Sequence, residues 1–296
     1  MSKPARQAIR FSWVLPLFMS AVFFISGLFA VIAPFPLIAL HYARGRSFAL
    51  LAAASNLVIV GVLSGVETAL LFAVFTLSIS LLLPEFLNKM KRVEWAGFLT
   101  LLVVAFLVLG SIVVSKKYYH LNLMAEFKAQ VSTFATDLGQ TQMQDEPEVA
   151  QFRDKVVSEL PSALAIAVLL SVWANLLLLL RFNPGNVKER IGIDPAFFLN
   201  WKAPYWLVWP TIALGFCLVF EVGLSHAGAM NFFKFIMAIY VIQGFGILAF
   251  FFEKYKIMGF FRTFLFTFLV VFMLPLVLGL GFFDQWFDFR AKFGQS

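Results

Sequence analysis

Cysteine and histidine are scarce in this 296-residue chain, which has one cysteine and three histidines. The single thiol, Cys217, can form neither an intramolecular disulfide nor a cysteine-based metal site, and within its apolar run we expect it to be a small packing residue. The histidines, His41, His120 and His226, all lie near expected membrane edges, and no metal site is predicted from them.

Catalytic signatures are also lacking. The sequence has no P-loop, no Gly-x-Ser-x-Gly, no His-Glu-x-x-His and no glycine fingerprint for a dinucleotide. The sparse carboxylates Glu67, Glu221 and Glu253 fall close to expected membrane edges, so no paired acid and base is evident deep in the membrane. We therefore predict no catalytic residue, no cofactor and no enzymatic activity.

Charged residues make up only 13% of the chain, whereas 61% of it is hydrophobic. Soluble domains carry about 25% charged and roughly 45–50% apolar residues. The apolar residues here form repeated stretches near the roughly 20 residues that cross the hydrocarbon core of a bilayer. The composition therefore predicts an all-α fold, a polytopic transmembrane helix bundle in contact with lipid.

We expect about eight full spans and one short segment, 34–43, that prolines break. Pro34 and Pro36 end the first span, and the piece at 37–43 reaches only far enough for a half-helix packed inside the protein or a thin crossing. A polar stretch over 116–160 reads as an extramembrane helical excursion, so the predicted domains are 1–115, 116–160 and 161–296. The full spans are predicted near 12–33, 47–64, 66–87, 95–114, 161–181, 203–225, 232–252 and 260–281.

The net charge of +7 arises from short basic clusters beside apolar stretches. Such clusters are typical of membrane orientation signals, so no nucleic-acid partner is expected. If 37–43 crosses the membrane, fifteen Lys and Arg residues fall on one side and eight on the other. We expect the richer side, with the N-terminus, to be cytoplasmic and the C-terminus to be outside.

Four polar residues inside the expected spans are candidate ligand contacts, because a polar side chain in hydrocarbon needs a partner and often lines a cavity. Each asparagine among them can equally form a helix-to-helix hydrogen bond. Next to the glutamine, Gly244 and Gly246 permit close approach of either a ligand or a neighbouring helix. The four are Asn56, Asn175, Tyr240 and Gln243.

Small residues four positions apart predict helix contacts. Gly61 and Gly65 fit this spacing, and Ser26 and Ala30 give the first expected span a smooth stripe. Each pair can pack within the chain or receive a partner subunit. Near the C-terminus, we expect Asp284 or Asp288 to pair with Arg290 as a structural lock.

Three segments carry a family resemblance: Trp201-Lys-Ala-Pro-Tyr-Trp, Tyr240-Val-Ile-Gln-Gly-Phe-Gly and Phe283-Asp-Gln-Trp-Phe-Asp-Phe-Arg290. They resemble the YybS-like bacterial membrane proteins, a family filed as a domain of unknown function, over most of the chain. The front half, with Pro34-Phe-Pro-Leu-Ile-Ala-Leu, is remotely similar to the substrate-binding components of energy-coupling-factor transporters and to MreD proteins. The resemblance implies a six-helix membrane core that binds a small molecule or a protein partner.

These observations predict a non-enzymatic, multi-pass protein of the bacterial inner membrane that acts in an assembly. It would scaffold envelope partners or present a small-molecule pocket. The alternative is the substrate-binding component of a vitamin-type uptake transporter. Such components commonly offer an Ala-x-x-x-Ala stripe on the first helix, and here only Ser26-x-x-x-Ala30 approximates it.

Overall fold

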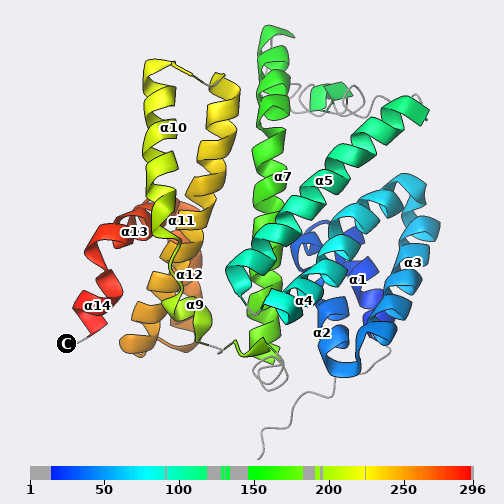
Figure 1. The fold of residues 1–296 in the computed structure, drawn as a ribbon, viewed down its shortest axis with the longest axis horizontal. Coiled ribbons are helices and arrows are strands. Elements are labelled where there is room, and N and C mark those ends of the chain that lie inside the picture. Colours follow the sequence, from blue (N-terminus) through cyan, green and yellow to red (C-terminus); the bar gives the residue numbers. More distant parts are fainter. Residues whose placement is uncertain are drawn as a thin grey trace, which may run out of the picture. The chain divides into compact units, whose positions relative to one another are not determined.

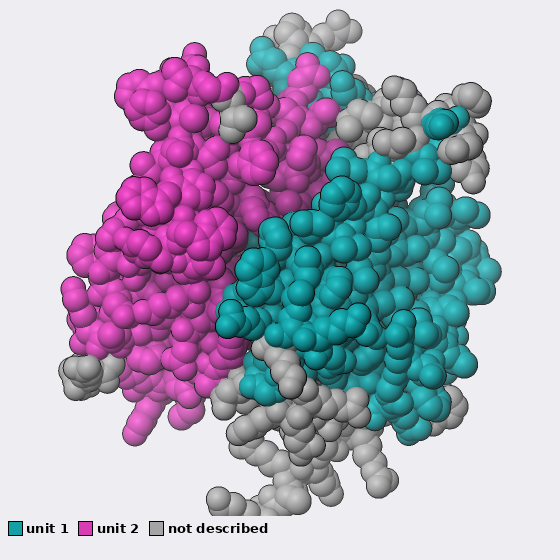
Figure 2. Space-filling model, in the orientation of Figure 1, with its two compact units in different colours: residues 1–153, 167–195 teal, residues 154–166, 196–296 magenta. Residues whose placement is uncertain are grey.

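The computed structural model describes residues 15–90, 92–118, 128–129, 131–133, 146–182, 191–193, 196–223 and 225–294. Every regular element in these residues is a helix, which confirms the all-α prediction. The chain divides into two compact units, coloured separately in Figure 2. Unit 1 comprises residues 1–153 and 167–195, and unit 2 comprises 154–166 and 196–296.

Fewer helices than expected are long enough to cross a bilayer. Within the described residues four pass by length and composition, or five if the bent pair near the C-terminus is one span, so eight full spans are not confirmed. Two expected spans, 12–33 and 203–225, coincide with short apolar helices of 10–17 residues, whereas a crossing takes about 20. The four helices that pass are Arg46–Met90, which folds back within its length as described below, Val93–Ser111, Ala150–Phe182 and His226–Lys254.

Unit 1 opens with a broken helix where the sequence predicts one span over 12–33. Helix α1 (Pro16–Ile25) ends before Gly27, whose φ of 68° is left-handed, and a 3₁₀ turn, η1 (Ala30–Ile32), leads into α2 (Phe35–Arg44). Eight consecutive residues of α2 are buried, from Phe35 to Tyr42. The proline-broken segment is therefore a half-helix packed inside unit 1, about 15 Å long at 1.5 Å per residue.

Helix α3 (Arg46–Phe72) contains the turn predicted at Ser64-Gly65. Gly65 has φ 87° and ψ 167°, outside the helical region. A Cβ on Gly61 would lie 3.7 Å from the Cβ of Ala69, although residues eight apart in a straight helix are about 12 Å apart. The chain therefore folds back at Gly65, as Figure 1 shows.

The rest of unit 1 is mostly long helix. A π-helical turn, η2 (Ala73–Leu77), joins α3 to α4 (Ser78–Met90), and α5 (Val93–Tyr118) follows. In helix α7 (Glu146–Phe182), residues 154–166 belong to unit 2 and the rest belong to unit 1. About half of the predicted excursion at 116–160 lies outside the described residues, namely 119–127, 130 and 134–145, so the predicted domain boundaries stay a prediction.

Unit 2 is arranged around α11 (His226–Lys254), which packs most extensively against α13 (Leu274–Phe287). Helix α12 (Gly259–Phe272) precedes α13, and the two are bent by 93°. The other elements are α9 (Phe197–Asn200), η3 (Tyr205–Leu207), α10 (Val208–Phe220) and α14 (Phe289–Gly294).

Glycines let α11 and α13 meet backbone to backbone. A Cβ on Gly281 would overlap the carbonyl oxygen of Tyr240, and one on Gly244 would overlap that of Val277. A Cβ on Gly246 would lie 2.6 Å from the carbonyl oxygen of Phe198 in α9. The sequence left open whether the glycines beside Gln243 face a ligand or a neighbouring helix. In the structure, Gly244 and Gly246 each lie against a neighbouring helix.

We expect Gly281→Ala to destabilise the protein by about 1–3 kcal/mol or more, because the added methyl meets backbone that cannot rotate away. Gly279→Ala in the same helix is the matched control, since a Cβ there meets nothing within 4 Å. Thermal unfolding in detergent, followed by tryptophan fluorescence, measures the difference. Equal melting temperatures for the two variants would contradict the close crossing.

Candidate functional site

Buried polar side chains satisfy the backbone at the break between α1 and α2. The carbonyl oxygen of Val31 accepts hydrogen bonds from Ser171 Oγ at 2.7 Å and from Asn175 Nδ2 at 2.9 Å, both on α7. The carbonyl oxygen of Ala33 accepts one from Ser20 Oγ at 2.6 Å. Irregular backbone is tolerated at membrane depth only where the protein buries and satisfies it. These side chains provide that satisfaction.

Asn56 on α3 clamps the first helix. Its Nδ2 donates to the carbonyl oxygen of Pro16 at 2.8 Å and to that of Ala52 at 2.7 Å, and its Oδ1 accepts from the backbone N–H of Ala21 at 2.7 Å. Pro16 and Ala21 are five residues apart in α1, so one amide contacts two successive turns of that helix. Both side-chain polar atoms of Asn56 are thereby used.

Asn175 is less fully paired. Its Nδ2 also donates to the carbonyl oxygen of Ser171 at 2.6 Å, but its Oδ1 is buried without a hydrogen-bond partner among the described residues. Thr76 Oγ1, in η2, is likewise buried without a hydrogen-bond partner among the described residues. An unpaired buried acceptor costs free energy, so Asn175 Oδ1 is a position where a donor from a ligand would be stabilising.

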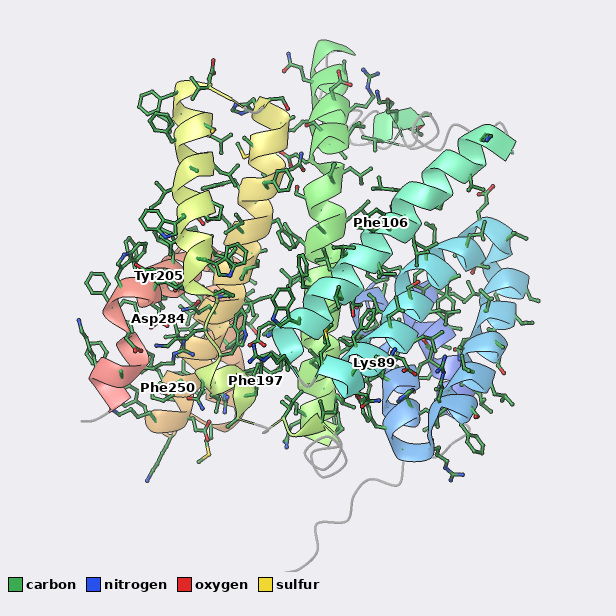
Figure 3. All side chains as sticks on the ribbon, viewed as in Figure 1. Lys89, Phe106, Phe197, Tyr205, Phe250 and Asp284 are labelled. Atoms are coloured by element: carbon green, nitrogen blue, oxygen red, sulfur yellow. The ribbon has the colours of Figure 1, made fainter. Side chains whose placement is uncertain are left out.

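A second network lies in unit 2, around Asp284 on α13, which Figure 3 labels. One carboxylate oxygen, Oδ2, accepts from Arg290 Nη2 at 2.8 Å and from Gln243 Nε2 at 2.9 Å. The other, Oδ1, accepts from the backbone N–H of Phe289 at 2.8 Å. Asp284 and Arg290 are 1% and 7% exposed, so water screens this pair little.

The same network secures the irregular chain that leads into α10. Arg290 Nη1 donates to the carbonyl oxygens of Leu199 and Trp201, each at 2.9 Å. Gln243 Oε1 accepts from the backbone N–H of Ala203 and from Gln285 Nε2, also each at 2.9 Å. One buried cluster therefore joins α11, α13, α14 and residues 199–203.

Of the two aspartates offered as partners for Arg290, the structure chooses Asp284. Asp288 instead pairs with Lys202 at 2.7 Å, and both of these side chains are nearly half-exposed. The hydrogen bond from Lys202 holds the pKa of the Asp288 carboxyl below its usual value. The two aspartates are four residues apart in sequence, but Asp284 forms a buried ion pair and Asp288 an exposed one.

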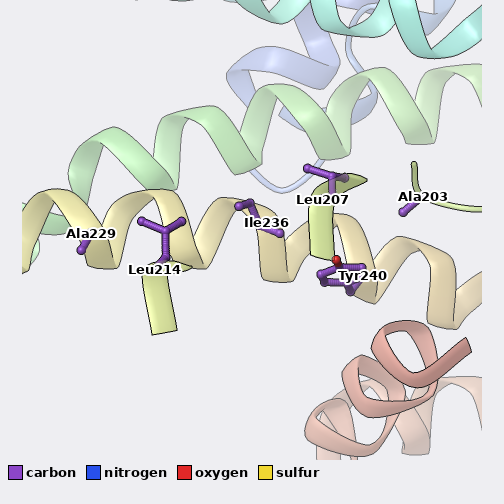
Figure 4. Close-up of a cluster of buried hydrophobic side chains, with 6 residues drawn as sticks. All are labelled: Ala203, Leu207, Leu214, Ala229, Ile236 and Tyr240. Carbon is purple, nitrogen blue, oxygen red and sulfur yellow. The ribbon is translucent and has the colours of Figure 1, made fainter. Parts of the chain in front are cut away.

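Tyr240 belongs to a hydrophobic cluster between α10 and α11, drawn in Figure 4. Its ring is fully buried, and its hydroxyl lies 3.4 Å from Thr211 Oγ1. Its ring packs edge-on against Phe282 of α13 at 5.3 Å between centroids. Tyr240 and Gln243 therefore belong to unit 2, on one helix, while Asn56 and Asn175 belong to unit 1 and contact different segments there.

A family model described as Predicted membrane protein (DUF2232) matches residues 13–285. The chain belongs to this family. No curated protein and no solved structure matches it. The DUF2232 match agrees with a multi-pass membrane protein. The matched range includes Asp284 and ends before its partner Arg290.

The small-residue pairs occupy turns more than helix faces. Ser26 Oγ accepts from the backbone N–H of Phe29 at the end of α1, and Ala30 begins η1, so these two residues do not share one continuous helix. Gly65 is the turn in α3, and a Cβ there would meet nothing within 4 Å. Packing of a partner subunit on these residues stays a prediction.

A cavity of about 370 Å³ in unit 2 of this DUF2232 protein is lined by residues other than the four candidates. Its lining is Leu199, Asn200, Phe250, Glu253 and Lys254. In the described part of the chain, no three His, Cys, Asp or Glu side chains gather as metal ligands would.

Sequence reasoning missed part of both networks. Ser171 stands four residues before Asn175, a spacing that places both side chains on one helix face and could have indicated a shared acceptor. Gln285 had no comparable signal, because its partners, Gln243 and Ala203, are 42 and 82 residues away.

We expect Asp284→Ala to destabilise the protein by about 3–5 kcal/mol, because it leaves the Arg290 guanidinium buried without a counter-charge. The control is Asp288→Ala, which removes a half-exposed ion pair worth at most about 1 kcal/mol. Thermal unfolding of both variants in the same detergent provides the measurement. A loss at Asp284 no larger than that at Asp288 would count against a buried lock.

Asn56→Leu should cost about 1–3 kcal/mol, since the backbone groups of Pro16 and Ala21 lose their partner. Ser55→Ala is the neighbouring control: its hydroxyl donates only to the carbonyl oxygen of Leu51 within the same helix. Limited proteolysis of the N-terminal region, read together with the melting temperature, tests the clamp. If the two variants behave alike, Asn56 does not hold α1.

Proposed function

We propose that the protein is a non-enzymatic component of an assembly in the bacterial inner membrane, where its helical bundle scaffolds envelope partners. One observation carries the proposal. The four candidate residues are fully buried, and each directs hydrogen bonds to neighbouring helices or turns. Polar groups that are hydrogen-bonded within the protein stabilise a fixed framework and leave few donors and acceptors for a solute.

The remote similarity of the front half to energy-coupling-factor substrate-binding components and MreD proteins, which implies a membrane core without catalytic residues, is compatible with this role. The basic clusters support a cytoplasmic N-terminus. Exposed apolar side chains cover the long helices, for example Val62 and Leu63 of α3 at 78% and 70% exposure. These surfaces suit lipid and membrane-embedded partner helices.

A small-molecule role, as in a vitamin-type uptake component, is supported by a single observation. Asn175 Oδ1 offers an unpaired acceptor beside the helix break of unit 1. A ligand bound there would raise stability by RT ln(1 + [L]/Kd). Asn175→Leu would abolish such a shift, whereas the Gln243 amide, which is already paired, would be a poorer contact.

The test is mild-detergent purification of the tagged full-length protein from its native membranes, followed by native mass spectrometry. We expect a stoichiometric protein partner and no retained small molecule. A retained small molecule without a protein partner would overturn the scaffold proposal. As a control, an unrelated multi-pass protein of similar size, tagged and purified identically, should not carry the same partner.

A further inference from the structure

The last three helices raise a question of topology that is separate from the proposed function. The sequence predicts that 260–281 crosses the membrane, so that the C-terminus lies on the other side of the membrane from the C-terminal end of α11. Two collinear arms of 14 residues would together extend about 42 Å, enough to cross. The observed bend of 93° leaves only one arm, about 21 Å, along the direction of α12.

The contacts along α11 show how far these helices advance. The ring of Phe266, midway along α12, packs edge-on against that of Phe252 and at a tilt against that of Phe245, with centroids 6.3 and 5.4 Å apart. Gly244 and Tyr240 then meet α13 through Val277 and Gly281. Tyr240 is 14 residues from Lys254, about 21 Å along α11. This depth equals the length of the one arm.

The chain next returns toward its starting point. Arg290 lies beside Gly246, and Phe293 reaches the last turn of α11, where its ring is 6.1 Å from that of Phe251. The Lys254 ammonium donates a hydrogen bond to the carbonyl oxygen of Phe293. Figure 1 shows α14 descending toward the end of α11 from which α12 departs.

We propose that α12, α13 and α14 form a re-entrant segment, which enters the membrane and leaves it on the side where α11 ends. Apart from Arg262 in its first turn, α12 presents a mainly apolar surface: none of its residues is buried, and Phe260, Phe264 and Phe268 form a stacked ladder on it. Such a surface is stable in lipid and costly in water.

The charge distribution agrees with this return. The loop after α11 and the start of α12 carry Lys256 and Arg262, next to Lys254. With re-entry, Arg290 and Lys292 join these basic residues on one side of the membrane, whereas a full crossing would separate the two groups. The buried Asp284–Arg290 pair then fastens the returning end to residues 199–203.

The experiment uses single cysteines in the full-length chain, with Cys217→Ala as the background because Cys217 is the one native thiol. Lys256→Cys, Lys292→Cys and His226→Cys report the start of the segment, its end and the opposite end of α11; all three positions are exposed. A membrane-impermeant maleimide is applied to sealed vesicles of one orientation, and then to permeabilised ones.

Lys256→Cys and Lys292→Cys should label in the same preparation, and His226→Cys in the other. Labelling of Lys292→Cys together with His226→Cys would overturn re-entry. If the cysteine-free background does not fold, an epitope at the C-terminus of the native chain, probed with antibody in the same vesicles, gives the same comparison against a tag inserted after Lys256.

Depth is tested by a spin label at Met273→Cys, at the bend and 42% exposed. We expect its relaxation to respond more to oxygen, which concentrates in the acyl chains, than to a water-soluble nickel complex. The label at Lys256→Cys should show the reverse preference. A nickel response at Met273 equal to that at Lys256 would place the segment on the membrane surface and overturn insertion.

Discussion

Hydrocarbon offers no hydrogen-bond partner, and this constraint governs how the chain can depart from regular helix. One break in each unit carries backbone carbonyls that side chains from other elements satisfy. In unit 1 the carbonyls of Val31 and Ala33 are met by side chains of α7 and α1. In unit 2 the carbonyls of Leu199 and Trp201 are met by Arg290. The breaks persist because distant helices satisfy them.

The groups that satisfy the breaks also fix the helices in place. Asn56 cannot bridge Pro16 and Ala21 unless α3 lies against α1, and Gln243 cannot reach both Ala203 and Asp284 unless α11 lies between them. Polar contacts thus add geometric specificity to a surface on which apolar packing alone is permissive. A framework fixed in this way suits a scaffold better than a pocket that must open.

Environment separates two carboxylates that look alike in sequence. Asp284 and Asp288 lie on either side of Trp286 in one polar-aromatic run, and each is close enough in sequence to meet Arg290. Close packing at Gly281 draws the start of that run against α11, so Asp284 is buried beside Gln243. Asp288, at the left-handed end of α13, turns outward to Lys202.

The sequence by itself determined the all-α membrane class and the turn at Gly65, because composition and glycine's freedom act locally. It placed the end of the first helix at Pro34 and Pro36, whereas α1 ends at Ile25, before the left-handed Gly27, and the prolines lie at the start of α2. It also indicated which polar residues would need partners. Only the tertiary structure decided what those partners are: Val31 for Asn175, Pro16 and Ala21 for Asn56, Asp284 for Gln243. Hydrogen bonds across 35 to 144 residues depend on which helices pack together, and hydropathy along a single chain does not encode that choice.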